Sequence, residues 1–402
     1  MTDPTGRCFI SYRRSRSAEV RALVEAHQDH GVPTWLDVDD LDTGPTEDQL
    51  RQVIRSQETA SAVMWITPEV KTSSVIRTVE APELFQRARH DDDFFLVPVA
   101  AGGLDFVEAA ATFDGIHPAE DLRRWNLLRA DSDPAVAAAT VLRRLVNRRV
   151  AAIHRALPPD APFRIGVYNR ARAPFHPGVA FAFDWLPAYD GRVATAGTWD
   201  ERLLPALAIV ADAVRAHAPG REVEAEGLAS VPAAVALGAA FLKVRGVRIG
   251  WRQLTDSTVG PCWSLGPRND SGFKAEIRGD DTSAAELAVL VEVADLVGPA
   301  LTRSASALPP FRAIITVRRG GQLPHRLDCS TAVDVAETTI AAIRQARARY
   351  PNLTKTHLFI AGPLALAMLT GQLLNTVGPV QTYEHIPDGG PGRYGRGCLI
   401  TS

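Results

Sequence analysis

The sequence predicts an α/β protein whose strands form parallel sheets, and three observations support this prediction. Between residue 7 and about residue 105, short apolar segments of strand length alternate with segments of helical periodicity, which is typical of a parallel sheet covered by helices. A proline-rich stretch at 158–162 then divides the chain into two parts. After it, a unit of strand, helix and strand occurs twice, so the second part is expected to contain two related lobes.

In the first part, we expect strands at 8–12, 34–38, 61–67 and 94–99. The first helix, at 17–30, ends at Gly31, and Pro33 follows shortly after it, as is common at helix ends. An acidic loop at 37–45 comes after the second strand. Two more helices follow this loop, and the second of them contains Glu80.

Residues 135–157 have leucine and valine at helical spacing, and we expect a connecting helix whose arginines face solvent: Arg143, Arg144, Arg148 and Arg149. The alternative is that this arginine cluster attracts nucleic acid. In the second part, strands are expected at 179–185, 221–227, 246–251, 311–317, 356–362 and 378–383. Helices are expected at 201–216, 230–243, 332–347 and 363–368. In both repeated units a glycine ends one strand, a proline lies in the first turn of the helix, and an aromatic residue ends the next strand.

Length, charge and cysteine spacing exclude several classes of protein. A chain of 402 residues is expected to form two or three domains. The formal net charge of −2 argues against a long nucleic acid as partner. The four cysteines form no C-x-x-C pair, which favours reduced thiols in the cytoplasm over disulfides or a metal site. The chain begins without the apolar core of a signal peptide, and its apolar runs are shorter than the roughly 20 residues of a membrane span.

The first quarter of the chain resembles Toll/interleukin-1 receptor (TIR) domains. Phe9–Tyr12 looks like box 1 of that family, and the loop at 37–45 stands where its long loop after the second strand belongs. The segment 73–80 resembles the serine and W-x-x-x-E pattern of the NAD-cleaving members, with Ile76 in place of the usual tryptophan. The resemblance implies a flavodoxin-like TIR domain at 1–125, and we expect a helical connector at 126–160.

Glu80 is the catalytic candidate within this resemblance. Cleavage of NAD+ separates nicotinamide from a ribose that passes through an oxocarbenium-like state, and a nearby carboxylate stabilises the developing positive charge. Ser73 precedes Glu80 and can cap the helix while directing its hydroxyl toward a ligand. The alternative interpretation is that Glu80 is an ordinary surface glutamate of a helix.

The other expected NAD+-binding residues are Ser11, Tyr12, Arg13, Trp35 and Asp37, together with Ser73. The first three end the first strand, and ligands of open parallel sheets bind at the carboxyl ends of strands. Arg13 is suited to the pyrophosphate, or else simply faces solvent. Trp35 either belongs to the core or stacks on a ring of the ligand. No G-x-G-x-x-G motif follows a strand, so NAD+ is expected as a substrate, with no cofactor required.

The second part resembles the SAVED domain, a tandem fusion of two CARF-like, Rossmann-type lobes that senses cyclic oligonucleotides in bacterial anti-phage signalling systems (CBASS). The residues that carry the resemblance are 357–371 and 381–385. It implies a SAVED domain at 161–402, with lobes at about 163–265 and 272–402.

A cyclic oligonucleotide needs amides or cations for its phosphates and flat surfaces for its bases. Gly227–Ser230 and Gly362–Leu364 each place a glycine turn before a helix N-terminus, where free N–H groups favour phosphate. We expect these two termini to meet in one shared pocket. The expected ligand residues are Trp199, Gly227, Ser230, Trp251, Gly362, Pro363, Leu364 and Tyr394, with Tyr383 as a further stacking candidate. The alternative to ligand binding is that these residues form ordinary turns and core aromatic contacts. The glycine-rich tail at 388–396 is expected to be flexible.

Together the two resemblances imply an antiviral effector. The SAVED half would bind a cyclic oligonucleotide, with cyclic tri-adenylate as the expected activator. A homo-oligomer or filament would then form, and its TIR domains would hydrolyse NAD+ to nicotinamide and ADP-ribose. Two alternatives remain open at this point: a TIR scaffold that recruits partners without chemistry, and a CARF-like nuclease that degrades the cyclic signal.

Overall fold

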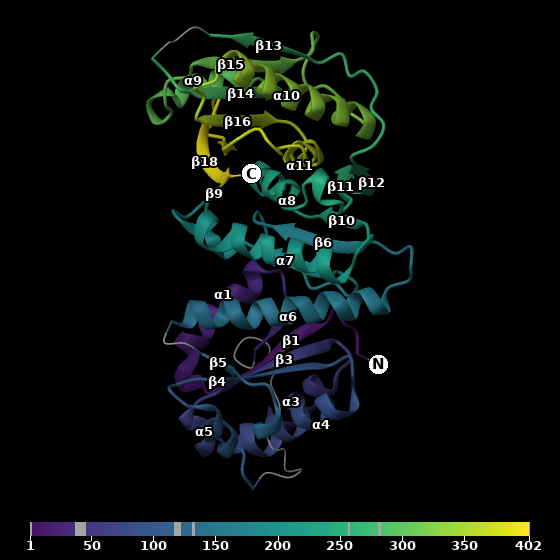
Figure 1. Cartoon of the computed structure of the whole chain (residues 1–402), viewed down its shortest axis with the longest axis vertical. Coiled ribbons are helices and arrows are strands. Elements are labelled where there is room, and N and C mark those ends of the chain that lie inside the picture. Colours follow the sequence, from purple (N-terminus) through teal and green to yellow (C-terminus); the bar gives the residue numbers. More distant parts are fainter. Residues whose placement is uncertain are drawn as a thin grey trace. The chain divides into compact units, whose positions relative to one another are not determined.

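The computed structural model describes residues 2–36, 46–115, 122–130, 133–255, 258–279 and 283–401, and Figure 1 labels its elements. The chain forms two compact units. The first consists of Met1–Pro159, Ala173–Phe183 and Asp212–Ala218, and the second of Asp160–Arg172, Asp184–Ala211 and Pro219–Ser402. Two elements, β7 (Phe181–Asp184) and α7 (Leu204–His217), extend across this division.

The first unit contains a five-stranded parallel sheet in the order β2-β1-β3-β4-β5. Its strands are β1 (Arg7–Ser11), β2 (Thr34–Trp35), β3 (Thr59–Ile66), β4 (Phe95–Ala100) and β5 (Leu128–Arg129). Its described helices are α1 (Ser17–Asp29), α3 (Thr46–Arg55), α4 (Ala81–His90), α5 (Phe106–Ala111) and α6 (Pro134–Ala156), and a π-helical turn, Ile76–Glu80, leads into α4. The predicted parallel sheet with covering helices is confirmed. Its order is that of flavodoxin-like sheets, with a switch point between β1 and β3.

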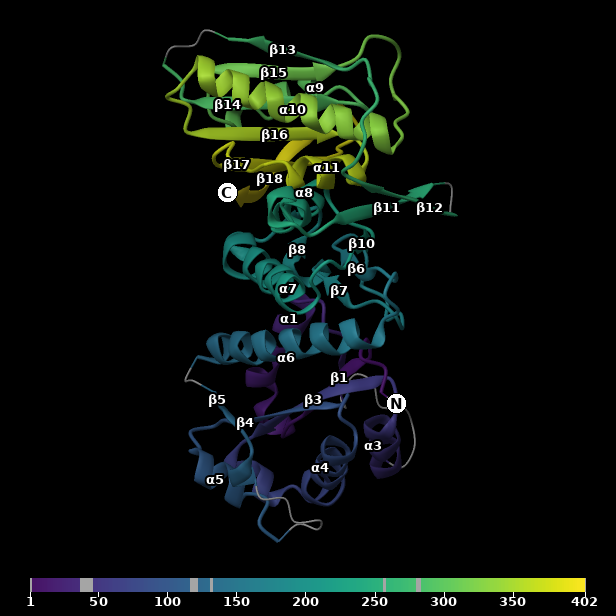
Figure 2. The ribbon, with the colours of Figure 1, turned by 45° about the vertical axis from the view of Figure 1, so that its right-hand side comes forward.

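Both faces of this sheet are covered. All residues of β3 are buried, and successive side chains of a strand point to opposite faces. Met64 and Ile66 join the hydrophobic core that includes residues of α3 and α4. On the other face, Nε1 of Trp65 donates to Oε2 of Glu19 in α1 at 3.3 Å. Figure 2 shows α3 and α4 on one side of the sheet and α6 on the other. The turn that contains Glu80 packs on the side of α3 and α4, because Val79 belongs to the same core.

One arginine of the connecting helix α6 is not where the sequence places it. Arg143 is exposed, as predicted, but Arg149 is 5% exposed. Its guanidinium donates to three backbone carbonyl oxygens, those of Thr5, Gly6 and Ala180, at 2.6, 2.7 and 2.8 Å. Burial lowers the pKa of Arg149 to about 10, so the group stays charged at neutral pH. Arg149 therefore attaches α6 to the N-terminal segment and to 173–183 of the same unit.

Two buried histidines, His27 in α1 and His30 at its C-cap, predict that the first unit loses stability in acid. Nδ1 of His27 and Nδ1 of His30 each lie 2.7 Å from the carbonyl oxygen four residues earlier. Burial lowers both pKa values from 6.5 to about 4. Because the folded state holds each histidine neutral, the stabilisation is complete above pH 6.5 and is lost as the pH falls toward 4. Each group accounts for at most about 3 kcal/mol of this loss.

The measurement is the free energy of unfolding in urea between pH 4 and pH 7. We expect His27→Gln to lose less stability than the unmodified protein as the pH falls from 6.5 to 4, since one of the two titrating groups is gone. Parallel pH curves for the two proteins would contradict the assignment.

The second unit contains two further sheets. Its first lobe has the strand order β12-β11-β10-β6, with β12 antiparallel to its neighbour. Its second lobe has the order β13-β15-β14-β16-β17-β18, with four parallel inner strands and an antiparallel strand at each edge. The two tandem α/β lobes that the internal repeat predicts are therefore present.

The bounds of the elements in the first lobe are β6 (Phe163–Tyr168), β8 (Tyr189–Asp190), β9 (Val193–Ala194), β10 (Val223–Glu226), α8 (Val231–Ala240), β11 (Ile249–Thr255) and β12 (Thr258–Ser264). Those of the second lobe are β13 (Lys274–Arg278), β14 (Glu286–Glu292), α9 (Gly298–Arg303), β15 (Ala313–Arg318), α10 (Cys329–Arg349), β16 (Lys355–Ala361), α11 (Leu364–Gln372), β17 (Val380–Ile386) and β18 (Arg393–Ile400). Across the described ranges, no helix is long and apolar enough to span a membrane, and all four cysteines are free thiols.

The expectation of a flexible glycine-rich tail is wrong for residues 393–396. These residues begin β18, which pairs with β17. The glycines in this strand permit close packing: a Cβ atom on Gly397 would lie 2.5 Å from Cγ of Pro232 and 2.7 Å from Oγ1 of Thr382. Glycine here reflects the close approach of β18 to the start of α8.

The two lobes meet where α8 packs against α11. A Cβ atom on Gly238 would lie 2.1 Å from the carbonyl oxygen of Met368, and one on Gly371 would lie 2.2 Å from that of Val235. A Cβ atom on Gly238 would also lie 3.0 Å from Cα of Gly371, so the two helices cross close to these two glycines. That the N-termini of α8 and α11 form one shared pocket stays a prediction.

Candidate functional sites

The carboxyl end of β1 holds three of the expected NAD+-binding residues, Ser11, Tyr12 and Arg13. Ser11 is buried, and the other two are half-buried. Oγ of Ser11 and Nε of Arg13 are buried and have no hydrogen-bond partner within the described part of the chain. Buried polar atoms are normally paired. These two atoms are therefore suited to a ligand at the switch point of the sheet.

Glu80 ends the π-helical turn before α4 and is 7% exposed. Such turns are frequent at functional sites. Oγ of Ser73 accepts a hydrogen bond from the N–H of Ile76 at 3.4 Å, which supports the start of this turn. Ser73 also lines an open pocket of about 530 Å³ together with Lys71 and Arg77, whereas Glu80 does not line it. Ser73 and Glu80 are close in sequence, but of the two only Ser73 lines this pocket.

The remaining two NAD+-binding candidates are Trp35 and Asp37. Trp35 is 5% exposed and stacks on Phe9, with ring centroids 5.1 Å apart, so its ring contributes to the core. Asp37 lies outside the described residues.

A larger open pocket lies at the carboxyl ends of β3, β4 and β5. Its volume is about 810 Å³, and its lining includes Glu19, Trp65, Gly102, Gly103 and Arg129. The sequence does not single out these residues, because they come from separate elements and form no local motif. The pocket is on the α1 side of the sheet, since Trp65 and Glu19 form it together.

In the first lobe, polar side chains converge on the N-terminus of α8. Ser230 caps the helix: its Oγ accepts a hydrogen bond from the N–H of Ala233 at 3.3 Å. Nδ2 of Asn169 donates to the same oxygen at 2.8 Å, and the hydroxyl of Tyr189 lies 3.5 Å from it. Asn169 is fully buried, yet its Oδ1 has no hydrogen-bond partner among the residues described. One polar atom of this cluster is thus left without a partner.

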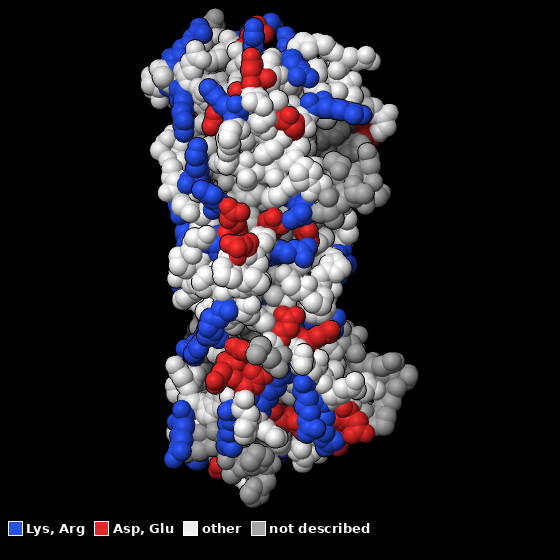
Figure 3. Space-filling view, turned by 90° about the vertical axis from the view of Figure 1, so that its right-hand side faces the viewer, with Lys and Arg blue, Asp and Glu red and all other residues white. Residues whose placement is uncertain are grey.

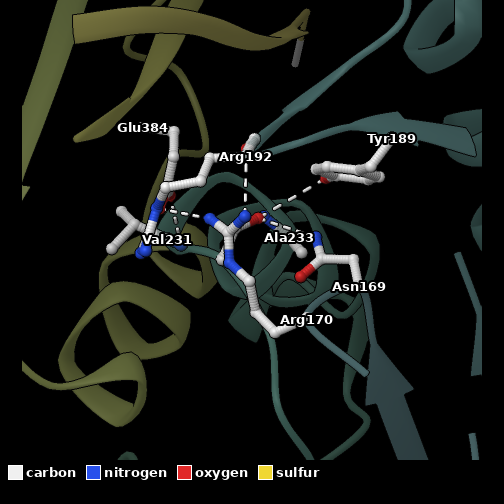
Figure 4. Close-up of polar contacts among 8 residues, drawn as sticks. Asn169, Arg170, Tyr189, Arg192, Val231, Ala233 and Glu384 are labelled. Carbon is white, nitrogen blue, oxygen red and sulfur yellow. Dashed lines mark hydrogen bonds and ion pairs between the residues drawn. The ribbon is translucent and has the colours of Figure 1, made fainter. Parts of the chain in front are cut away.

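A carboxylate from the second lobe completes the cluster (Figure 4). Oε2 of Glu384, in β17, accepts a hydrogen bond from the N–H of Val231 at 3.2 Å. Its Oε1 forms an ion pair with Arg170, and Nη2 of Arg192 lies 3.4 Å from the same oxygen. Burial raises the pKa of Glu384, and the two arginines oppose this shift. Glu384 therefore links the second lobe to the positive end of α8.

The four aromatic stacking candidates are all buried. Trp199 packs edge-on against Trp185 at 5.6 Å between ring centroids, and Tyr394 packs edge-on against Phe359 at 4.8 Å. The exposed fractions of Trp199, Trp251, Tyr383 and Tyr394 are 6%, 2%, 2% and 8%. In this structure their rings make core contacts, so stacking on a ligand stays a prediction.

The two expected glycine turns are both at carboxyl ends of strands. Gly227 follows β10 with φ of 135°, and a Cβ atom there would lie 2.1 Å from the carbonyl oxygen of Val167, so the position requires glycine. Gly362 follows β16, and Pro363 is the N-cap of α11. Within the described part of the chain, no side chain caps α11. Gly362, Pro363 and Leu364 are all half-buried.

The sequence interpretation missed Asn169, Arg170, Arg192 and Glu384. Glu384 was recognised only as part of a segment that resembles SAVED domains. Asn169 and Arg170 directly follow β6, a strand that the sequence interpretation did not predict, so the carboxyl-end rule was not applied to them. No local signal marks Glu384, since its partners are about 150 to 210 residues away in the chain.

Neither metal binding nor a broad basic surface is supported. No group of three or more His, Cys, Asp or Glu residues that could hold a metal occurs in the ranges that the structure describes. On the face shown in Figure 3, Lys and Arg are interspersed with Asp and Glu. This mixture agrees with the small net charge.

Comparison with known proteins identifies the second part of the chain. Residues 207–400 match the family model of the SAVED domain, described as "SMODS-associated and fused to various effectors sensor domain". Residues 207–400 are therefore a SAVED domain, as the resemblance implied for this region. No curated protein matches the sequence.

Among solved structures, the chain is similar to the Acinetobacter baumannii Cap4 SAVED/CARF-domain containing receptor with the cyclic trinucleotide 3'3'3'-cAAA. The similarity covers 90% of this chain and 86% of that chain, with 12% sequence identity and a TM-score of 0.51. The same receptor with 2'3'3'-cAAA gives 13% identity and a TM-score of 0.49 over the same shares of the two chains. At this identity, the first similarity shows a shared fold.

Proposed function

We propose that the chain is a receptor for a cyclic oligonucleotide that controls an NAD+-cleaving domain at its N-terminus. The observation that carries the proposal is the SAVED match over residues 207–400. Cyclic tri-adenylate is the expected activator, because a SAVED/CARF receptor of the same fold has been solved with a cyclic trinucleotide of adenylates.

The second unit offers groups suited to such a ligand. In the first lobe, Asn169, Arg170 and the turn from Gly227 to Ser230 follow parallel strands, at the edge where α/β sheets bind ligands. In the second lobe, the turn from Gly362 to Leu364 holds the same position after β16. Guanidinium groups and N–H groups at helix starts are the donors that phosphates prefer.

For the first unit, we propose NAD+ hydrolysis with Glu80 as the catalytic residue. The bond between nicotinamide and C1′ of the ribose breaks, the bonding electrons leave with nicotinamide, and Glu80 stabilises the positive charge that develops on the ribose. The oxygen of a water molecule then bonds to C1′ and a proton is released, which gives ADP-ribose. Arg13 would bind the pyrophosphate at the carboxyl end of β1. The burial of Glu80 supports this role, because a carboxylate acts more strongly on a nearby cation when water is excluded.

Assembly is the proposed switch. The resemblance to TIR enzymes implies that an adjacent copy supplies loops to the active site, so a single copy would be inactive. Ligand binding would promote a homo-oligomer or filament, in which the head-to-tail contact repeats without closing.

The test is to incubate the purified chain with NAD+ and a panel of cyclic di-, tri- and tetranucleotides. Free nicotinamide and the surviving cyclic nucleotide are then measured. We expect nicotinamide release with cyclic tri-adenylate and full recovery of that ligand. Absence of nicotinamide under every ligand would favour a TIR scaffold, and loss of the cyclic nucleotide would favour a nuclease.

A further inference from the structure

Glu384 occupies a place that is built for an anion. Its carboxylate belongs to the second lobe, but all of its hydrogen-bond and ion-pair partners given by the structure belong to the first: the N–H of Val231 at 3.2 Å and the guanidinium groups of Arg170 and Arg192. The side chain of Glu384 is 8% exposed, whereas that of Arg192 is 47% exposed. Two cations and a helix N-terminus thus surround a single buried negative charge.

Asn169 provides a second, independent sign of a ligand. The residue is fully buried, its Nδ2 donates to Ser230, and its Oδ1 has no partner within the described ranges. A buried carbonyl oxygen without a partner costs free energy, so a donor from a ligand would remove that cost. Ribose hydroxyls and the amino group of adenine are such donors.

We propose that Arg170, Arg192 and the N-terminus of α8 form a phosphate subsite for the cyclic oligonucleotide, and that Glu384 is a built-in competitor for it. This inference rests on the proposed function. A phosphodiester carries one negative charge and offers two oxygens, as the carboxylate does. It would take over the N–H of Val231 and both guanidinium groups, while Asn169 Oδ1 accepts a hydrogen bond from the nucleoside.

Displacement of Glu384 links ligand binding to the contact between the lobes. Glu384 joins β17 of the second lobe to α8 of the first. A phosphate bound to the same groups would displace the carboxylate of Glu384, so this contact between the lobes and the bound phosphate exclude each other. If only a fraction of the receptor molecules is in the state that can bind ligand, the apparent affinity falls in proportion to that fraction. Removing the competitor should therefore increase the apparent affinity.

The test is calorimetric titration of cyclic tri-adenylate into the full chain and into Glu384→Gln. Glutamine has the same shape and can still accept the hydrogen bond from Val231, but it carries no charge to pair with the arginines. We expect the variant to bind at least about 5-fold more tightly, which is the lower end of typical coupling between sites. Equal or weaker binding by the folded variant would overturn the proposal.

The matched control is Glu286→Gln. Glu286 also pairs with two basic groups, Nε2 of His357 at 2.9 Å and Nζ of Lys355 at 3.8 Å. It lies at the opposite end of the second sheet, at the start of β14. Its replacement should leave the affinity for cyclic tri-adenylate unchanged. An equal gain in affinity in this control would show that the effect of Glu384→Gln comes only from the lower negative charge of the protein.

Two further results separate the inference from the proposed function. Arg192→Gln removes a half-exposed cation of the subsite and should weaken binding even if Glu384→Gln fails to fold; unchanged binding in this variant would overturn the subsite. If neither the unmodified chain nor Glu384→Gln binds any cyclic oligonucleotide, the proposed function fails as well. If both bind with the same affinity, the receptor function stands and the competitor does not.

Discussion

Glu80→Gln is expected to reduce nicotinamide release by the ligand-activated protein roughly 10²- to 10³-fold. Glutamine keeps the size of the side chain but carries no charge to stabilise the positively charged ribose of the transition state. Binding of cyclic tri-adenylate should be unchanged, because Glu80 lies in the first unit and the SAVED match lies at 207–400. The measurement is initial-rate release of nicotinamide at saturating activator.

Glu83→Gln is the matched control. Glu83 is three residues further along, in the first turn of α4, and pairs with Arg55 through two contacts of 2.6 and 2.7 Å. Loss of this surface ion pair should cost no more than about 1 kcal/mol of stability and should leave the rate unchanged. Full activity of the Glu80→Gln protein would contradict the catalytic role of Glu80. A protein that never releases nicotinamide but still transmits the ligand signal would support the scaffold alternative.

Gly371→Ala is expected to lower the free energy of unfolding of the second unit by about 1–3 kcal/mol. In most helices this change is favourable, because glycine costs roughly 0.5–1 kcal/mol relative to alanine. Here the new Cβ atom would lie 2.2 Å from the carbonyl oxygen of Val235. Backbone atoms cannot change rotamer as a side chain can, so α8 and α11 must move apart to make room for the new Cβ atom.

The control for this prediction is Gly298→Ala. Gly298 begins α9 in the same unit, and a Cβ atom there would meet nothing within 4 Å. Its replacement should change stability by less than about 0.5 kcal/mol. Urea unfolding of both variants measures the difference. Equal stability of Gly371→Ala and Gly298→Ala would show that the lobes are not held together at this contact.

Much of the fold can be read from local patterns. The buried strands β3 and β4 consist mostly of apolar residues and end near prolines or small residues. The repeated glycine, proline and aromatic pattern predicts both lobes. Very short strands such as β5, with two residues, carry too little pattern to be recognised. β18 was missed because its glycines indicate flexibility locally, whereas their role is to pack against Pro232.

The candidate sites could be predicted only in part. Strand ends and glycine turns directed attention to Ser11, Gly227 and Gly362, because the carboxyl-end rule depends on local sequence. Arg149 and Glu384 could not be found in this way. Each is a charged residue buried by contacts with segments more than 30 residues away, and the sequence alone gives no indication of which distant segments meet.

The most direct test follows ligand occupancy and nicotinamide release in one titration of the full chain with cyclic tri-adenylate. We expect negligible release without ligand and a rate that rises with the fraction of SAVED domains occupied. A rate of NAD+ cleavage that is the same at zero and full occupancy would contradict control of the first unit by the second.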